Sequence, residues 1–329
     1  MFEKMKMRVI ASLVIGLSAC SSSVLGSNQG PVICPTPTCG AQTGPTAVMP
    51  SWTDLAYATV SASEKLDLYT PTGLGPFPTV IYVHGGGFRI GDKNAAVNKG
   101  IVAALLADGY AVASVNYRLS GEAIFPAAPH DVKAAIRWLR ANASYYHLDP
   151  QKFGVWGDSA GANLASLMGT SCGDPYLEGN LGNPLQSSCV QAVVDLYGNM
   201  SFLLMDKDYE NSGITCAQNP ETHHLPSSAE SQYISDLGDS IVDHPVRVRQ
   251  ADPINYISGD EPPFFIQHGT ADCTVPPQQS QRFYDALVAK IDPNTVSFGF
   301  LTGAEHGDPM FTSSSNLALV LAFLDQYLK

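Results

Sequence analysis

From about residue 51 onward, short apolar segments alternate with longer segments in which apolar residues recur every three or four positions. Short apolar runs are typical of buried strands, and the three-to-four spacing is typical of helices with one face on a core. The predicted strands cover residues 56–60, 65–69, 79–84, 110–116, 153–156, 190–197, 263–268 and 296–301. The predicted helices cover residues 98–108, 128–143, 160–168, 277–291 and 315–328. This alternation predicts an α/β fold with a mostly parallel, eight-stranded sheet covered by helices on both faces.

Two segments depart from this alternation. Residues 21–50 are rich in Ser, Gly, Pro and Thr and show no periodicity, which predicts a flexible tether. Residues 199–262 separate two predicted core strands and are too long for an ordinary connection. We interpret 199–262 as a cap-like or lid-like insertion that shapes a pocket without supplying the chemistry. The folded domain is then expected to span residues 51–329.

The first twenty residues, 1–20, have the layout of a secretory signal. Basic residues precede an apolar run over 9–17, which is too short for a membrane-spanning helix of roughly 20 residues. The sequence Leu-Ser-Ala-Cys at 17–20 resembles the lipobox of bacterial lipoproteins, which implies that Cys20 is lipidated and that export leads to a membrane-anchored protein. Ser21 after this Cys implies transfer to the outer membrane. Ordinary signal cleavage near the same place, followed by secretion, is the alternative.

Composition narrows the class of protein. The chain of 329 residues is 45% hydrophobic and 15% charged, values that suit one packed globular domain. A formal net charge of -12 argues against a nucleic-acid partner, because binding the phosphate backbone requires clustered Lys and Arg. Contact with a membrane is expected only through the N-terminal lipid anchor.

Six cysteines remain once Cys20 is set aside, an even number in a chain expected to leave the reducing cytoplasm. We predict two local disulfides, Cys34–Cys39 across a Pro-rich turn and Cys172–Cys189 across a Gly-rich loop. Cys216–Cys273 is then left by elimination and would tie the insertion to a later loop. Six cysteines allow 15 connectivities, so other pairings stay open.

The strongest chemical signal is the sequence GDSAG at 157–161, which has the pattern G-x-S-x-G. It follows a predicted buried strand and opens a predicted helix, the context of a nucleophile elbow. Small residues must flank the Ser because the turn is tight, and the helix N-terminus favours developing negative charge. A helix-capping role for Ser159 is the alternative, and the strand before it and helix after it favour a nucleophile.

A second glycine-rich turn, HGGGF at 84–88, follows another predicted strand. Acyl transfer needs backbone N–H groups aimed at the carbonyl oxygen as it becomes an oxyanion, and glycine lets the backbone approach closely. The turn resembles the HGGG motif of lipases and esterases. We assign the N–H groups of Gly85, Gly86 and Ala160 as oxyanion donors, with Gly87 able to replace one of them. A phosphate-binding loop is excluded because no Lys-Ser/Thr pair follows.

An acid and a base are expected on later loops. Asp272 follows the predicted strand 263–268, and His306 follows the last predicted strand in a loop of small residues. The chain order Ser, acid, His is that of the α/β-hydrolase triad. A turn-capping role is the alternative for Asp272. Four other carboxylates lie too near another motif or too early in the chain to fit this order, namely Asp131, Asp158, Glu305 and Asp308.

The other histidines have structural interpretations. We expect His84 to order its glycine-rich turn and His268 to end a strand as a buried polar residue. His223 and His224 form a pair, but no Cys or carboxylate spacing completes a zinc site, so no metal is expected and both are interpreted as surface residues.

From about residue 66 to the C-terminus, the chain resembles α/β-hydrolase esterases of the hormone-sensitive-lipase and carbohydrate-esterase-like group. The matching motifs are HGGGF at 84–88, NYRL at 116–119, FPAA at 125–128 with Asp131, GDSAG at 157–161, the 268–272 segment and the loop of His306. The resemblance implies two-step acyl transfer without a cofactor, with Ser159 as nucleophile, His306 as general base and Asp272 as the orienting acid.

Relatives in this group include acetyl-xylan and feruloyl esterases, which implies a small-molecule or polysaccharide ester as substrate. An acetyl or feruloyl group on a carbohydrate is the first expectation. General short-chain carboxylesterase or lipase action is the alternative. A non-catalytic binding protein of the same fold is a third possibility, although such relatives usually lose a triad member and all three members are present here.

Overall fold

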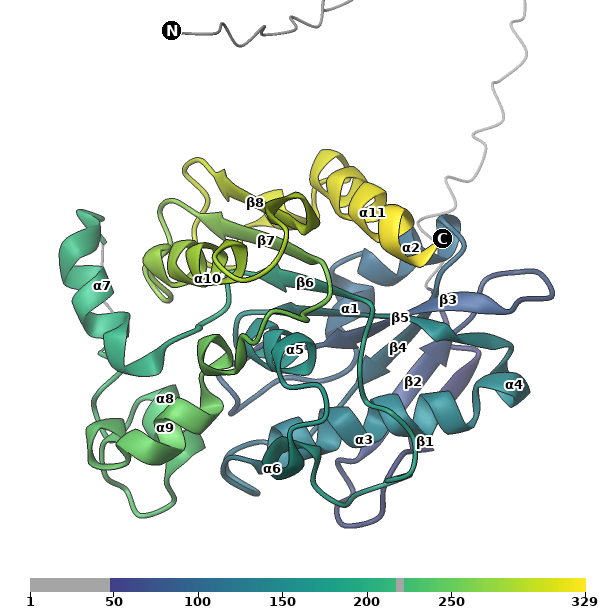
Figure 1. Ribbon diagram of the computed structural model, residues 1–329, viewed down its shortest axis with the longest axis horizontal. Coiled ribbons are helices and arrows are strands. Elements are labelled where there is room, and N and C mark those ends of the chain that lie inside the picture. The colour runs from purple at the N-terminus through teal and green to yellow at the C-terminus, as the bar shows by residue number, and fades with distance from the viewer. Residues whose placement is uncertain (1–47, 217–221) are drawn as a thin grey trace, which may run out of the picture. The chain divides into compact units, whose positions relative to one another are not determined.

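The computed structural model describes residues 48–216 and 222–329, and the strands within them form one sheet (Figure 1). The strands are β1 (Trp52–Ala56), β2 (Lys65–Tyr69), β3 (Phe77–Val83), β4 (Ala111–Val115), β5 (Leu148–Asp158), β6 (Ala192–Leu196), β7 (Phe264–Gly269) and β8 (Val296–Leu301). Their order is β1-β2-β4-β3-β5-β6-β7-β8, and β2 runs in the direction opposite to the other strands. The predicted eight-stranded, mostly parallel sheet is therefore confirmed for the described residues.

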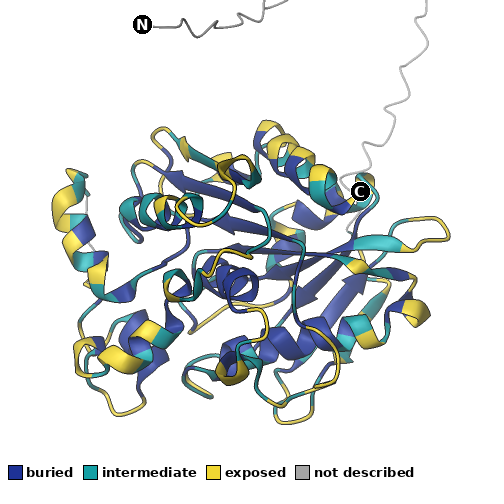
Figure 2. Cartoon of the chain, in the orientation of Figure 1, coloured by how far each residue is buried: buried dark blue, intermediate teal, exposed yellow. Residues whose placement is uncertain are grey.

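Helices cover both faces of the sheet, so its central strands are buried on both sides, whereas the edge strands β1 and β8 keep exposed residues (Figure 2). Along β3, Ile81 and Val83 join the core on one face, whereas Val80 and Tyr82 join the core on the other, as the alternation of strand side chains requires. The first face is covered by α3 (Ala127–Ala141), α4 (Ala143–Tyr146), α5 (Ala160–Thr170) and α10 (Gln278–Val288). The second is covered by α1 (Ala95–Asn98), α2 (Ile101–Ala107) and α11 (Ser314–Leu328).

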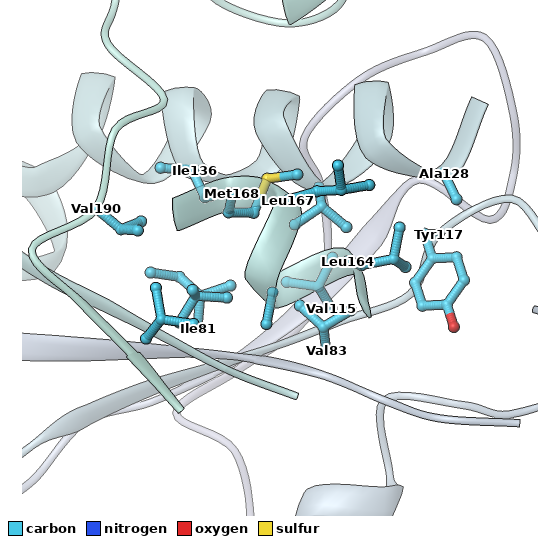
Figure 3. Close-up of a cluster of buried hydrophobic side chains, with 14 of the residues drawn as sticks. Ile81, Val83, Val115, Tyr117, Ala128, Ile136, Leu164, Leu167, Met168 and Val190 are labelled. Carbon is cyan, nitrogen blue, oxygen red and sulfur yellow. The ribbon is translucent and has the colours of Figure 1, made fainter. Parts of the chain in front are cut away.

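The core on the first face lies between the sheet and helices α3 and α5 (Figure 3). Ile136 of α3 and Leu164 and Met168 of α5 pack over Ile81 and Val115 of the strands. Each fully buried aliphatic side chain of this kind stabilises the fold by roughly 1.5–3 kcal/mol. Helix α5 has no exposed face, which explains why most of its residues are apolar or small.

The first strand was predicted wrongly at 56–60 and lies at Trp52–Ala56. Residues 57–61 instead wrap around Glu64. The N–H groups of Val60 and Ser61 donate hydrogen bonds to the Glu64 carboxylate at 2.6 and 3.0 Å, and the N–H of Tyr57 donates to its carbonyl at 3.1 Å. Their backbone groups are used in this turn and cannot pair with β2.

In its described residues, the predicted insertion between β6 and β7 contains three short helices, and Figure 1 shows them grouped at one end of the sheet. They are α7 (Met205–Ser212), α8 (Ala229–Ile234) and α9 (Pro245–Ala251), with 3₁₀ turns at Phe202–Leu204, Ile241–Asp243 and Pro253–Tyr256. Asp208 of α7 accepts hydrogen bonds from Arg282 at 2.5 Å and from Gln279 at 2.7 Å, which fixes α7 to α10.

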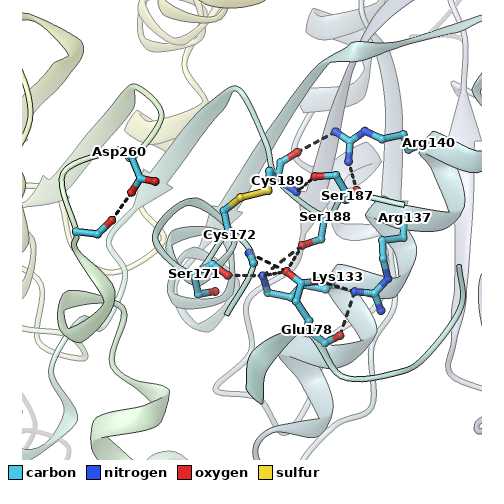
Figure 4. The surroundings of a disulfide bond; sticks show 12 residues. Lys133, Arg137, Arg140, Ser171, Cys172, Glu178, Ser187, Ser188, Cys189 and Asp260 are labelled. Atoms are coloured by element: carbon cyan, nitrogen blue, oxygen red, sulfur yellow. Dashed lines mark hydrogen bonds and ion pairs between the residues drawn. A yellow bond between two sulfur atoms is a disulfide. The ribbon is translucent and has the colours of Figure 1, made fainter. Parts of the chain in front are cut away.

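A partly buried ionic cluster fastens the loop after α5 to helix α3 (Figure 4). Glu178, at the end of α6 (Pro175–Glu178), accepts hydrogen bonds from Lys133 at 2.8 Å and Arg137 at 2.7 Å. The Cys172–Cys189 disulfide closes the same loop.

Further 3₁₀ turns lie at Pro293–Thr295 and Pro309–Thr312. Within the described residues, no helix combines the length and apolar character that a membrane crossing requires.

Candidate active site

The loops that follow β3, β5, β7 and β8 meet at one edge of the sheet, because the carboxyl ends of parallel strands share an edge. After β5, Ser159 adopts φ 56° and ψ −126°, an unusual conformation for a residue with a side chain. A methyl group added to Gly157 would lie 2.0 Å from the carbonyl oxygen of Gly161, and one added to Gly161 would lie 2.1 Å from that of Val83. Both glycines are therefore required by close backbone approach in a nucleophile elbow.

Three predicted residues converge at this edge. His306 Nε2 lies 2.8 Å from Ser159 Oγ, and His306 Nδ1 lies 2.7 Å from Asp272 Oδ2. Asp272 is fully buried, whereas His306 keeps 20% of its side chain exposed. The hydroxyl, imidazole and carboxylate thus form one hydrogen-bonded line from the interior to the surface, the geometry of a Ser-His-Asp triad.

The buried Asp272 carboxylate is stabilised in its charged form. Burial raises the pKa of Asp272, but the charge of His306 and hydrogen bonds from His268 and His306 lower it further, so this pKa lies well below its usual range. The N–H groups of Thr274 and Val275 each donate to Asp272 Oδ1 at 2.9 Å. An ionised carboxylate beside His306 fixes the imidazole orientation and favours its protonated form during a reaction.

His268 contacts the acid of the triad, which the sequence did not predict. It is buried at the end of β7, as expected, with Nδ1 2.6 Å from Ser280 Oγ and Nε2 2.9 Å from the Val275 carbonyl. Its Nε2 also lies 3.2 Å from Asp272 Oδ2. The spacing of four residues between His268 and Asp272 was the available signal for this contact.

Contacts of His84 and Tyr117 hold the glycine-rich turn after β3 in place. The His84 ring stacks on Tyr117 with centroids 4.5 Å apart, and the Tyr117 hydroxyl donates to the His84 carbonyl at 2.8 Å. His84 Nδ1 lies 2.8 Å from the Gly85 carbonyl, the ordering contact predicted for it. Gly86 has φ 118° and Gly87 has φ 59°, in the range where side chains are strained.

A cavity of about 480 Å³ opens beside Ser159. Gly86, Gly87 and Ala160 line it, together with Ser159 and His306. Gly85, the third predicted oxyanion donor, is not part of the lining. This size falls within the range of small-molecule sites, roughly 300–1,000 Å³.

Two residues of the site were assigned no role from the sequence. The Tyr197 ring contacts the His306 ring edge-on, with centroids 4.9 Å apart, and so limits the positions that the imidazole can take. Asp158, which precedes the predicted nucleophile, accepts hydrogen bonds from Tyr82 and Lys99. Neither contact has a local sequence signal, because the partners are between 59 and 109 positions apart along the chain.

The interpretation of His223 as a surface residue was wrong. Its side chain is 1% exposed, and its Nδ1 lies 3.2 Å from Glu230 Oε2. Helix α8 covers this side of the insertion, which the sequence pattern alone did not indicate. His224 is partly exposed, at 33% of its side chain. Within residues 48–216 and 222–329, no cluster of three His, Cys, Asp or Glu side chains has the arrangement of a metal site.

Two of the predicted disulfides fall within the described residues, and both are present. Cys172 and Cys189 are joined with Cα atoms 5.0 Å apart, and Cys216 and Cys273 with Cα atoms 6.0 Å apart. The second bond links the insertion to the residue next to Asp272. The remaining predicted pair, Cys34–Cys39, and the predicted lipidation site, Cys20, lie outside the described residues.

Known proteins are similar to this chain in sequence and in fold. A profile of the BD-FAE family matches residues 66–287. The chain belongs to the BD-FAE family. The chain is 31% identical to Esterase LipQ of Mycobacterium tuberculosis over 77% of this chain and 56% of that protein. The chain spans about half the length of the curated relatives it matches.

Solved structures extend the comparison. A truncated form of a carbohydrate esterase from gut microbiota matches with a TM-score of 0.73 and 30% identity, covering 86% of this chain and 98% of that one. A bifunctional GH43-CE protein of Bacteroides eggerthii matches with a TM-score of 0.73 and 33% identity, over 84% of this chain and 35% of that one. These likenesses place the BD-FAE domain among carboxylic ester hydrolases of the α/β-hydrolase fold.

Proposed function

We propose that the protein is a serine carboxylic ester hydrolase that acts through an acyl-enzyme on short-chain or carbohydrate-linked esters. The observation that carries this proposal is the line of hydrogen bonds from Asp272 through His306 to Ser159, which ends at a cavity. A binding protein of the same fold would gain nothing from a strained serine held against an imidazole.

In the proposed mechanism, His306 takes the hydroxyl proton as Ser159 attacks the ester carbonyl, and Asp272 stabilises the resulting imidazolium. The oxyanion is held by backbone N–H groups. Because Gly86, Gly87 and Ala160 line the cavity and Gly85 does not, we assign the donors to these three residues, with Gly87 in place of Gly85. Water, activated by His306, then attacks the acyl-enzyme by the same route and releases the acid.

The cavity lining offers a few apolar side chains to an acyl group. Among the described lining residues, Ile90 and Tyr197 are large, and Ala160, Ala229 and Val275 are small. A short acyl group can bury its apolar area against these side chains. The likeness to a carbohydrate esterase supports an acetyl or feruloyl ester of a carbohydrate as substrate. General short-chain carboxylesterase action is the second candidate, favoured by the likeness to Esterase LipQ.

The direct test is Ser159→Ala, assayed with p-nitrophenyl acetate and with acetate release from acetylated xylan. We expect a fall in turnover of at least about 10³-fold, more than the loss of one oxyanion donor. A fluorophosphonate probe should label the parent protein and not the variant. Parental rates in Ser159→Ala, or an unlabelled parent protein, would show that the site does not perform this chemistry.

We also propose that the protein acts outside the cytoplasm, attached to a membrane by a lipid on Cys20. The disulfides Cys172–Cys189 and Cys216–Cys273 support an oxidising compartment. Cells fed a labelled fatty acid should incorporate the label into the parent protein. Cys20→Ala should abolish the incorporation, and equal labelling of the two proteins would contradict the proposal.

A further inference from the structure

Helix α8 of the insertion is fixed directly against the glycine-rich turn. A methyl group added to Gly87 would lie 3.0 Å from the Cβ of Ala229. The Tyr233 ring stacks on Phe88 with centroids 3.8 Å apart and an interplanar angle of 6°. The first turn of α8 is therefore part of the wall of the site, next to the proposed oxyanion donors.

This turn brings a buried carboxylate to the cavity. Glu230 is 5% exposed and belongs to the cavity lining. Its Oε2 lies 3.2 Å from His223 Nδ1, and the His223 backbone is itself fixed because its N–H donates to Asp206 at 2.7 Å and its carbonyl accepts from Ser228 at 2.7 Å. The Glu230 carboxylate is thus paired with a histidine whose backbone is fixed by α7 and by the N-cap of α8.

The proposed acyl transfer makes no use of this carboxylate. A buried carboxylate is costly unless hydrogen bonds satisfy its oxygens, and its two oxygens can accept about four. His223 accounts for a contact to one oxygen only. A ligand group that donates a hydrogen bond to Glu230 would stabilise the carboxylate and would be bound more tightly than an apolar group of the same size.

We infer that Glu230 is a specificity-determining residue that accepts a hydrogen bond from a hydroxyl group of the substrate. The inference rests on the proposed esterase function. Two parts of a carbohydrate ester can supply this hydroxyl: the sugar on the alcohol side, or the phenol of a feruloyl group on the acyl side. In both cases the site selects esters that carry a hydroxyl group over matched esters that lack it.

The test compares kcat/KM of the parent, Glu230→Gln and Glu230→Ala on paired substrates. Monoacetylated xylobiose is paired with ethyl acetate for the sugar hydroxyl. Methyl ferulate is paired with methyl 3,4-dimethoxycinnamate, which lacks the phenol hydroxyl. For Glu230→Ala we expect a loss of about 10- to 100-fold on one hydroxyl-bearing ester, the value of a hydrogen bond to a charged group, and a change below about threefold on its partner.

Glu230→Gln keeps the volume and one acceptor oxygen, so its loss should be smaller and confined to the same ester. The matched control is Glu210→Ala, which removes an exposed glutamate from α7 of the same insertion and should leave all rates unchanged. Loss confined to the xylobiose ester assigns the sugar hydroxyl, and loss confined to the ferulate assigns the phenol.

Equal losses on both members of each pair would show a structural role for Glu230 and overturn the inference. Unchanged rates on both hydroxyl-bearing esters would overturn it as well. Failure of the proposed function is distinguishable, because the parent protein would then hydrolyse none of the four esters. Thermal unfolding of each variant, measured alongside, identifies a Glu230→Ala protein that does not fold, in which case Glu230→Gln decides.

Discussion

Two carboxylates of this protein, one fully buried and one partly buried, have similar electrostatic surroundings and different consequences. Asp272 lies between His268 and His306, and Glu178 lies between Lys133 and Arg137 (Figure 4). Burial raises the pKa of both carboxyl groups, and in both cases nearby positive charge and hydrogen bonds lower it by more. Each carboxylate is therefore held in its charged form.

The two carboxylates differ in the side chains that pair with them. Lys133 and Arg137 are buried, donate hydrogen bonds and end the network at Glu178, so that cluster only fastens a loop. The His306 imidazole can accept as well as donate a hydrogen bond, and it reaches a serine at a cavity. Both carboxylates are paired, and only a partner that can transfer a proton to an accessible atom gives chemistry.

Variants of the two carboxylates should differ most in their turnover. Asp272→Asn should lower kcat on p-nitrophenyl acetate by about 10³- to 10⁴-fold, because an amide no longer holds the required imidazole tautomer. Glu178→Gln should leave kcat within about threefold, because Glu178 is not part of the cavity lining. Steady-state kinetics at neutral pH measure both values. Comparable losses in the two variants would mean that the Glu178 cluster also supports the site.

The two disulfides sharpen the comparison, because one lies in each region. In the loop-entropy model, bonds separated by 57 and 17 residues stabilise by about 4 and about 3 kcal/mol. Cys216→Ser/Cys273→Ser should therefore unfold at lower urea concentration than Cys172→Ser/Cys189→Ser. Only the first double variant should also lose turnover, since Cys273 is bonded to Asp272 along the chain. Equal turnover in both would show that the triad loop keeps its position without the bond.

The smallest effect is expected in the pH dependence of stability. Because the folded-state pKa of Glu178 lies below its unfolded value, the unfolded protein binds more protons in acid. The contribution of Glu178 is complete well above its unfolded pKa of about 4.3 and is lost as the pH falls through the folded pKa. Between about pH 5 and pH 3, the free energy of unfolding should fall less steeply in Glu178→Gln than in the parent, as urea titrations measure. Identical slopes would contradict the pairing.

Local sequence was sufficient for the parts of the site that depend on backbone pattern. The strands at Lys65–Tyr69 and Val296–Leu301 were predicted with their observed bounds. Gly157 and Gly161 mark Ser159 because the tight turn excludes side chains there, and the order of strands indicated which loops carry Asp272 and His306. The sequence alone therefore determined the sheet, the elbow and the candidate residues.

The tertiary structure decided which residues of distant segments meet. Glu230 and Tyr197 reach the site, His223 is buried, and Gly87 lines the cavity whereas Gly85 does not, although no local pattern separates these residues from their neighbours. Periodicity reports only that a side chain faces inward or outward on its own element. Its contacts depend on how helix α8 and the loops pack across the sheet edge, and that packing is a property of the whole folded domain.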